Sequence, residues 1–401
     1  MTSFLRNTPL FAISQGLMIS AVSLVVTCSA LVGLTLSPDK SLATLPLAAM
    51  FITTMLGSVP ASFLLEKIGR KKGFMLATLI GMSASAISTY AIMEHQFWMF
   101  VSGIGLLGLF NSFGNYFRFA AADAVSVKYK SRAISYVMLG GVIAAFIGPN
   151  LANVAKNWIV DAEFAGSYAV LMVIYVLMFL ALSATSFAQA KTKSEHDTQL
   201  KPPRPLKVIA KQPKFIVAIV CAMLGYGVMS LIMTATPLAM KHHNHSFTDT
   251  SFIIQYHLLG MFIPSFFTGS LIRSFGIFRI LIAGVLSGFA CVAINLSGHD
   301  IEHYWVSLVL LGVCWNFLFI GGTTLLTETY TATERAKAQA LNDFIVFSTA
   351  AFASLSAGYL QHQFGWQVVN IGVIPLLLLI LISLLWIQSK PLNNPINSIE
   401  N

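Results

Sequence analysis

Long runs of apolar residues recur along this chain, and they constrain its fold more than any other feature. Inside a bilayer every backbone amide must be paired within its own segment, so a run of about 20 apolar residues predicts a transmembrane helix. Hydrophobic residues make up 56% of the 401 and charged residues only 10%, whereas a soluble domain needs about 25% charge to cover its surface. The composition excludes a soluble enzyme and predicts an all-α membrane protein.

We predict twelve transmembrane helices in two sets of six. The longest connection, 189–213, is polar and basic and contains Pro202, Pro203 and Pro205, which suits a linker. The predicted organisation is an N-terminal six-helix bundle at 1–188, a cytoplasmic linker at 189–213 and a C-terminal six-helix bundle at 214–401. The expected spans are 10–36, 42–65, 73–93, 97–122, 131–154, 165–188, 214–240, 248–272, 277–297, 304–328, 335–361 and 365–387.

Lysine and arginine are distributed unequally between the predicted loops. The loops on one side carry only Lys40, Lys156 and Lys241, while the side with both termini carries nearly all the other bases. Because positive loops stay inside, both termini are expected in the cytoplasm and the protein in the cytoplasmic (inner) membrane. The net charge of +9 comes from basic residues scattered over these short loops. Because they do not form one basic surface, the charge does not indicate nucleic-acid binding.

The two predicted halves repeat each other. Four landmarks recur at offsets of 204, 207, 204 and 203 residues, which indicates parallel repeats about an axis along the membrane normal. Such a pair can rock about a central site between the halves. The landmark pairs are Pro9-Leu10-Phe11 and Pro213-Lys214-Phe215, Gly69 and Gly276, Leu106-Leu107-Gly108 and Leu310-Leu311-Gly312, and Arg132-Ala133 and Arg335-Ala336.

The loop at 62–72 resembles the Gly-x-x-x-Asp-Arg-x-Gly-Arg-Arg signature of the major facilitator superfamily. Glu66 stands at the acid and Gly69-Arg70-Lys71 at the turn, while Ser62 replaces the usual glycine. The second copy keeps Gly269 and Gly276 but has Arg273 at the acid position. The resemblance covers nearly the whole chain. It implies a monomeric secondary transporter that works by rocker-switch alternating access.

The same loop predicts a cytoplasmic gate. Gly69 allows the tight turn, Arg70 can pair with Asp123, and Arg273 can pair with Glu328. Glu66 could lie against a helix N-terminus, where the dipole favours a carboxylate. These pairs would hold the cytoplasmic side shut; in the alternative interpretation they only anchor helix ends at the interface.

Gly148 and Pro149 in the fifth span are similar to the Gly-Pro motif of proton-coupled antiporters in this superfamily, and we expect them to shape that helix. Ala144 stands where the motif has another glycine, so the sequence leaves import and export open.

Polar groups in a membrane usually face a cavity or a partner. In the resembled fold the first, second, fourth and fifth spans of each half line the cavity. Polar side chains in these spans are the predicted substrate-binding residues: Asn111, Asn115, Tyr226, Gln255, Asn316 and Asn342.

His257 and Asp343 are the predicted proton-coupling residues. An imidazole with a pKa near about 6.5 can titrate at physiological pH. The alternative for His257 is a neutral ring hydrogen-bonded to a neighbouring helix. Arg118 could pair with Asp343, with Asp123 or with a substrate anion.

No metal or cofactor is predicted. The histidine-rich segments 241–245 and 299–303 lie in short loops that do not define a ligand geometry. The four cysteines are expected to pack as small apolar residues, and no Walker A string is present.

The predicted function is secondary active, proton-coupled transport of a small organic solute across the membrane, with uptake of a metabolite or chelate favoured. Proton-coupled efflux of amphipathic drug-like compounds is one alternative. A membrane receptor or scaffold that keeps the transporter fold but moves nothing is another.

Overall fold

The computed structural model describes residues 2–117, 120, 130–185, 204–331 and 333–389. Within these ranges the chain is helical and contains no strand. Asp123 and Arg118, which the sequence analysis placed in the gate and near the site, lie outside the described residues.

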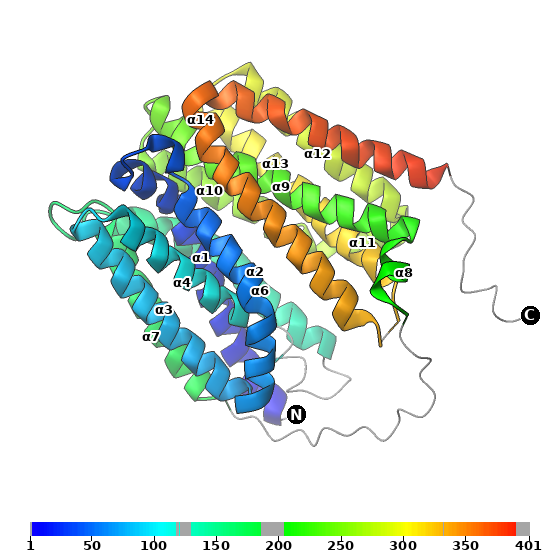
Figure 1. Cartoon of the computed structure of the whole chain (residues 1–401), viewed down its shortest axis with the longest axis horizontal. Helices are drawn as coiled ribbons and strands as arrows, with labels where there is room; N and C mark the ends of the chain where they lie inside the picture. Colours follow the sequence, from blue (N-terminus) through cyan, green and yellow to red (C-terminus); the bar gives the residue numbers. More distant parts are fainter. Residues whose placement is uncertain (1, 118–119, 121–129, 186–203, 332, 390–401) are drawn as a thin grey trace, which may run out of the picture.

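The N-terminal helices form one group, seen in blue to teal in Figure 1. Helix α1 packs against α6 and α7, α2 packs against α4, and α3 lies between α4 and α7. Their bounds are α1 Thr2–Leu36, η1 Lys40–Leu42, α2 Leu45–Ile68, α3 Arg70–Met93, α4 Phe97–Gly114, α6 Lys130–Ala155 and α7 Ala165–Ser183.

The C-terminal helices form a second group, coloured green to red in Figure 1. Helix α13 packs against α9, α10 and α12, and α14 packs against α9 and α12. Their bounds are α8 Leu206–Ala210, α9 Pro213–His242, α10 Phe247–Phe262, α11 Ser265–Phe275, α12 Ile277–Ser297, α13 Ile301–Thr327 and α14 Arg335–Gln388.

The C-terminal half contains two interrupted helices: α14, which is broken at Gly365, and the bent pair α10 and α11. Gly365 has φ 78° and separates two helices inside α14. The apolar stretch Lys337–Gln388 has 52 residues, about 78 Å of helix against a hydrocarbon core of about 30 Å, so it must turn back once. Helices α10 and α11 are bent by 41° and together make one apolar unit.

The all-α membrane architecture predicted from the apolar runs is confirmed. Nine helices in the described ranges are long and apolar enough to cross a membrane, or ten with the bent pair, and Gly140–Ala155 is a shorter apolar helix. Each of the twelve predicted segments overlaps one of the helices given above. Twelve crossings remain a prediction.

The turns after α2 and α11 have the same backbone conformation. Gly69 has φ 84° and ψ 147°, and Gly276 has φ 85° and ψ 149°. Side chains rarely tolerate this region, so glycine is needed at both turns. The two positions are counterparts in the sequence repeat.

Glycine also sets how closely helices approach. A Cβ on Gly148 of α6 would lie 2.6 Å from the carbonyl oxygen of Ser20 in α1. Lipid tails are as apolar as leucine, so membrane helices associate through such close packing of small residues. Gly148 therefore brings α6 against α1, beside Pro149 within the same helix.

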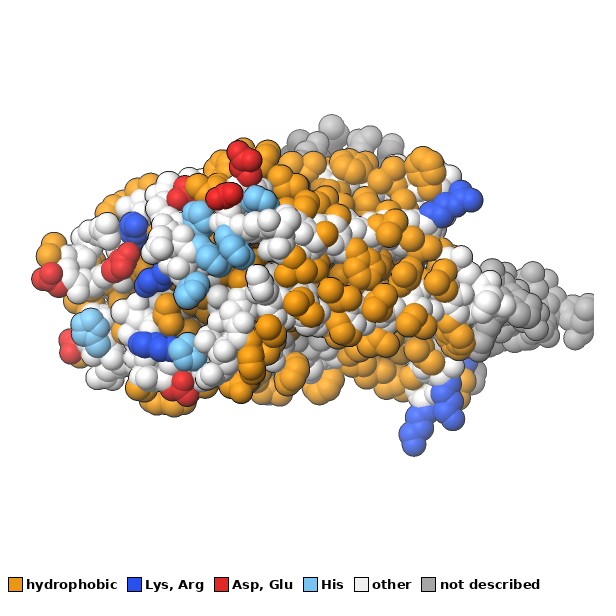
Figure 2. All heavy atoms as spheres, turned by 90° about the horizontal axis from the view of Figure 1, so that it is seen from above, with side chains coloured by type: hydrophobic (Ala, Val, Ile, Leu, Met, Phe, Trp, Pro, Cys, Tyr) orange, Lys and Arg blue, Asp and Glu red, His pale blue; other side chains and the backbone are white. Residues whose placement is uncertain are grey.

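The molecule has an apolar middle and two polar ends. Figure 2 shows hydrophobic side chains over the middle of one face, with histidine and acidic side chains gathered at one end. The charged side chains visible at the opposite end are lysine and arginine. We call these the histidine end, with the loops 37–44, 241–246 and 298–300, and the linker end, with residues 204–212 and 328–334.

Replacing Gly148 by alanine is expected to lower the free energy of unfolding by about 1–3 kcal/mol, because the new methyl overpacks α1 against α6. Gly372→Ala in α14 is the control, since nothing lies within 4 Å of its Cβ position. Thermal unfolding of both variants in one detergent checks the difference. Equal melting temperatures would contradict the proposed packing role of Gly148.

Candidate functional site

At the histidine end, α14 is bonded to the start of α2. The Thr44 hydroxyl accepts from the backbone N–H of Gly358 at 3.1 Å and donates to the carbonyl oxygen of Leu355 at 3.4 Å. The short helix η1 packs against α14 beside them. We call these contacts the α2–α14 seam.

A second seam joins α6 to α10 at the same end. The Asn150 amide donates to Gln255 Oε1 at 2.6 Å, and the Thr248 hydroxyl donates to Asn153 Oδ1 at 3.3 Å. The ring of Phe247 meets that of Phe164 edge to face, with centroids 4.8 Å apart. Gln255, predicted to bind substrate, therefore bonds to the other half in this conformation.

At mid-depth, Tyr226 lies at the centre of an aromatic cluster. Its ring makes edge contacts with four others, at centroid distances of 5.7–6.4 Å. Helices α2, α9, α13 and α14 all contribute, so the cluster joins the two halves. Its members are Phe51, Tyr226, Trp315, Phe319 and Phe347.

Several buried polar atoms in α4, α13 and α14 have no hydrogen-bond partner. They include Asn111 Oδ1 in α4, Trp315 Nε1 in α13 and Asn342 Oδ1 in α14. The Asn342 amide nitrogen does have a partner, since it donates to Asp343 Oδ1 at 3.0 Å. Because an unpaired buried polar group is destabilising, these atoms need an explanation.

Asn316, by contrast, is fully engaged at the α10–α11 bend. Its amide donates to the Met261 carbonyl and to Ser265 Oγ, each at 2.6 Å, and its oxygen accepts from Thr268 at 2.6 Å. These bonds connect α13 to the bend, where Pro264 has no N–H to donate. In this conformation both the amide nitrogen and the amide oxygen of Asn316 are used to anchor a broken helix.

Asn115 lies just past the end of α4, where its backbone N–H donates to the Asn111 carbonyl at 3.1 Å. Its side chain is half-buried, so it can still reach a ligand.

The two predicted proton-coupling residues differ in exposure. His257 is 0% exposed, and its Nδ1 lies 2.8 Å from the Leu308 carbonyl of the neighbouring helix α13. This is the contact expected in the alternative interpretation of a neutral ring. Asp343 is exposed on α14 and accepts from Asn342.

The predicted gate pair Arg273–Glu328 is not made in this conformation. Within the described side chains, Glu328 pairs with Lys214 at 3.1 Å and Arg273 donates to Ser270 at 2.9 Å. Glu66 is exposed at the end of α2, and Arg70 begins α3 after the Gly69 turn.

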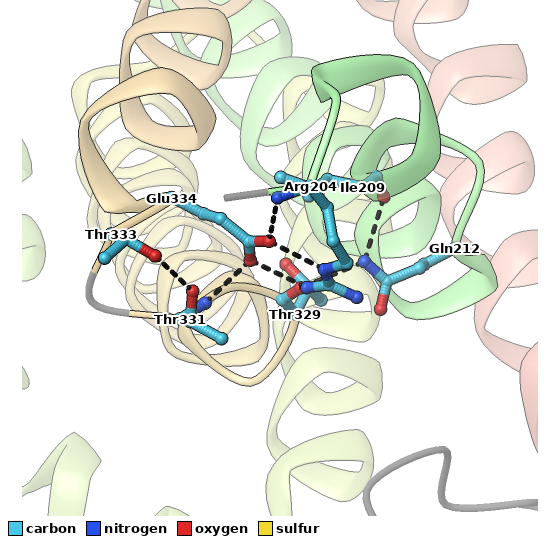
Figure 3. Close-up of polar contacts among 7 residues, drawn as sticks. All are labelled: Arg204, Ile209, Gln212, Thr329, Thr331, Thr333 and Glu334. Atoms are coloured by element: carbon cyan, nitrogen blue, oxygen red, sulfur yellow. Dashed lines mark hydrogen bonds and ion pairs between the residues drawn. The ribbon is translucent and has the colours of Figure 1, made fainter. Parts of the chain in front are cut away.

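At the linker end, an ion pair between Arg204 and Glu334 holds the linker in place (Figure 3). The sequence did not predict this pair. The Arg204 guanidinium donates to both carboxylate oxygens of Glu334, at 2.7 and 2.8 Å, and also to the Thr329 carbonyl. The Glu334 side chain is only 2% exposed. The hydrogen bonds from Arg204 hold the pKa of Glu334 well below its usual range, so the carboxylate stays charged at any physiological pH.

An apolar groove of about 440 Å³ lies between α2 and α4, lined by Thr53, Gly57, Gly105 and neighbouring residues. It opens on the face of α2 away from the other half, because Phe51 and Met55 on the opposite face contact Tyr226 and Ser348. The groove is therefore separate from the interface between the halves.

The histidine-rich loops bond to their neighbours. His243 Nδ1 lies 2.9 Å from the Tyr304 hydroxyl, and His245 Nε2 lies 2.7 Å from the His299 carbonyl. In the part of the chain that the structure describes, no three potential ligands are placed to hold a metal.

Sequence reasoning missed most members of the seams and the aromatic cluster. Thr44 and Asn150 stand in or beside apolar runs, so their polarity was a signal that could have singled them out. The cluster aromatics carry no such signal, because 12% of the chain is aromatic.

Comparison with known proteins gives consistent results. A family model described as "Major Facilitator Superfamily" matches residues 10–317 and 289–400. A protein named riboflavin transporter RfnT from Brucella anthropi is 40% identical over 394 residues, covering 97% of each chain. An uncharacterized MFS-type transporter, YddS, from Bacillus subtilis is 27% identical over 379 residues, covering 90% of this chain and 86% of that one.

Two solved structures share the fold. One, described as a bacterial metal transporter, has a TM-score of 0.69 at 14% identity and covers 96% of this chain and 99% of its own. The other, a mutant of the nucleoside transporter NupG, has a TM-score of 0.72 at 12% identity, with 94% and 99% covered. At these identities the likeness concerns the fold alone.

Removing the Asn150–Gln255 bond is expected to loosen the α6–α10 seam. One hydrogen bond contributes about 0.5–1.5 kcal/mol, so Asn150→Ala should raise the population with separated histidine ends about twofold to tenfold. Spin labels on cysteines introduced at Asn157 and Phe252, both exposed, report the distance. Gln255→Ala should add little to Asn150→Ala, and Asn115→Ala, outside the seam, should leave the distance unchanged. Additive effects of the two seam variants would contradict a shared bond.

Arg204→Ala is expected to destabilise the protein by about 1–3 kcal/mol, because it leaves the buried Glu334 carboxylate without its main donor. Adding Glu334→Gln should restore part of the loss by removing the buried charge. Lys207→Ala, an exposed base on α8, is the control. Since the pKa of Glu334 is lowered, its contribution to stability is complete above the ordinary pKa of a glutamate and is lost only as pH falls through the lowered value. A pH drop from about 7 to 5 should therefore not mimic Arg204→Ala in thermal unfolding.

Proposed function

The chain belongs to the major facilitator superfamily, and we propose that it carries riboflavin into the cell by proton-coupled secondary transport. It is a multi-pass membrane transporter of small solutes and not an enzyme. The observation that carries the choice of cargo is the 40% identity to a riboflavin transporter over 97% of both chains.

The proposed mechanism is a rocker switch between the two six-helix halves, 1–188 and 214–401, linked by 189–213. The position of the contacts between the two halves supports this mechanism. Among the side chains that the structure describes, the bonds and ring contacts between them lie at the histidine end and at mid-depth. A pair of bodies joined at one end can open at the other. We assign the linker end to the cytoplasm, from the placement of lysine and arginine, so we propose that this conformation is the inward-facing one.

The predicted gate charges fit the opposite conformation. When the linker end closes, Arg70 would meet Asp123, and Glu328 would exchange Lys214 for Arg273. Exposed ion pairs are worth little, about 0–1 kcal/mol, so such an exchange adds no large barrier. Glu66 would complete this gate at the end of α2.

Proton coupling is proposed for Asp343 and His257. Asp343 is exposed toward the linker end, where a proton could be released to the cytoplasm. His257 would take part only after α10 and α13 separate, because its ring is buried and bonded to Leu308. Asp343 is the better-placed carrier in this conformation.

Purified protein in proteoliposomes is expected to accumulate riboflavin against its gradient when the outside is acidic. Asp343→Asn should abolish this accumulation but keep exchange of labelled for unlabelled riboflavin, because only the coupled proton is lost. Asp161→Asn, an exposed acid in a loop at the histidine end, is the control. His257→Gln keeps a donor for the Leu308 carbonyl and should retain accumulation.

Riboflavin binding without movement under any gradient would instead favour the receptor alternative. Accumulation unaffected by Asp343→Asn would keep the transporter and remove Asp343 as the carrier. Riboflavin expelled in preference to being taken up would favour efflux.

A further inference from the structure

Trp315 has a feature that ordinary packing does not explain. Its side chain is 8% exposed and its ring stacks on Phe319, with centroids 4.9 Å apart and planes at 13°. Its indole Nε1 is buried without a hydrogen-bond partner. A buried donor left unpaired costs about 1–3 kcal/mol, and buried indole groups usually find a partner. A ligand with an acceptor would remove this penalty.

The position of Trp315 is suited to a ligand that moves between the halves. Its ring lies 5.9 Å from that of Tyr226, which in turn lies 6.4 Å from Phe51 of the N-terminal half. Neither Trp315 nor its aromatic neighbours carry charge. The environment therefore favours a neutral planar ring over an ion.

Asn111 is the counterpart of Trp315 in the sequence repeat. The two are 204 positions apart (315 − 111), the offset that also relates Leu106-Leu107-Gly108 to Leu310-Leu311-Gly312. Each lies 14 residues after the start of its helix, at Phe97 in α4 and Ile301 in α13, about 21 Å along the axis. Asn111 is 8% exposed and its Oδ1 is also unpaired. The repeat thus presents an unpaired donor from one half and an unpaired acceptor from the other, each at the same distance from the start of its helix.

An unpaired donor, an unpaired acceptor and uncharged aromatic faces together define a ligand chemistry. A planar heteroaromatic ring with a carbonyl next to a ring N–H offers the complementary groups on one edge and a face for aromatic contact. The pyrimidinedione ring of a flavin has this pattern. A sugar lacks a planar aromatic face, and a metal ion lacks the hydrogen-bonding edge.

Resting on the proposed function, we propose that Trp315 and Asn111 are the specificity-determining polar contacts of the cargo subsite. Trp315 Nε1 donates to a ring carbonyl, Asn111 Oδ1 accepts from the adjacent ring N–H, and Tyr226 and Phe51 supply aromatic contact.

Riboflavin binding to the purified protein, followed by the change in flavin fluorescence, tests the proposal. Trp315→Phe keeps an aromatic ring but removes the donor, and should weaken binding about tenfold, the equivalent of 1.4 kcal/mol. Trp366→Phe is the matched control, because Trp366 Nε1 is also buried and unpaired but its ring lies against Tyr304, outside the cluster. Tyr226→Ala should lose most affinity, because it removes the ring at the centre of the aromatic cluster.

A second arm varies the ligand and needs no folding-sensitive variant. Riboflavin methylated at the pyrimidinedione N–H should bind the unaltered protein about tenfold more weakly. Asn111→Leu should weaken riboflavin to a similar extent and leave the methylated compound unaffected, because the bond is already absent.

The outcomes separate this proposal from the proposed function. If Trp315→Phe binds as well as Trp366→Phe and methylation has no effect, the subsite is overturned while riboflavin transport stands. If the unaltered protein neither binds nor moves riboflavin, both fail. If riboflavin is transported and the losses follow Trp315 and Asn111, the subsite is established.

Discussion

The exclusion of water from the bilayer is the constraint on which the rest of this structure depends. It requires every backbone amide in the hydrocarbon core to be paired, which this chain does within helices. It also removes the hydrophobic driving force for helix association. Packing must then come from close approach, which Gly148 allows between α6 and α1. It must also come from buried polar bonds such as those of Asn316 at the α10–α11 bend. The fold thus meets two requirements, paired backbone amides and helix association without a hydrophobic driving force.

The same constraint sets the strength of the contacts between the halves. The seams at the histidine end use hydrogen bonds between uncharged groups, such as Asn150–Gln255 and Thr44–Gly358. A few bonds of about 0.5–1.5 kcal/mol each give a total of a few kcal/mol. A ligand must supply about 5.5 kcal/mol to invert a two-state population from 1:99 to 99:1. Seams of this kind are strong enough to hold one conformation and weak enough to be exchanged for another.

The aromatic cluster spans the interface between the halves, because Phe51 of the N-terminal half contacts Tyr226 of the C-terminal half. A change in the arrangement of the halves would therefore alter the cluster. Trp315 Nε1 and Asn111 Oδ1 have no hydrogen-bond partner in this conformation, and unpaired buried polar atoms are destabilising. A ligand that pairs them gains most in a conformation where both reach it. Binding energy would then be coupled to the arrangement of the halves, as alternating access requires.

The sequence by itself determined the helical membrane class, the family and the position of nearly every helix, because lipid imposes length and apolarity on each segment separately. It also identified the glycine turns at Gly69 and Gly276, a local backbone demand. It predicted roles for Gln255, Asn316 and His257 but could not identify their partners, because an amide or imidazole in an apolar run suits a substrate or a neighbouring helix equally well. Only the tertiary structure shows the partner that each has in this conformation, by placing Asn150, Met261 and Leu308 within hydrogen-bond reach. Such partners are far apart in sequence, and their proximity depends on how whole helices pack.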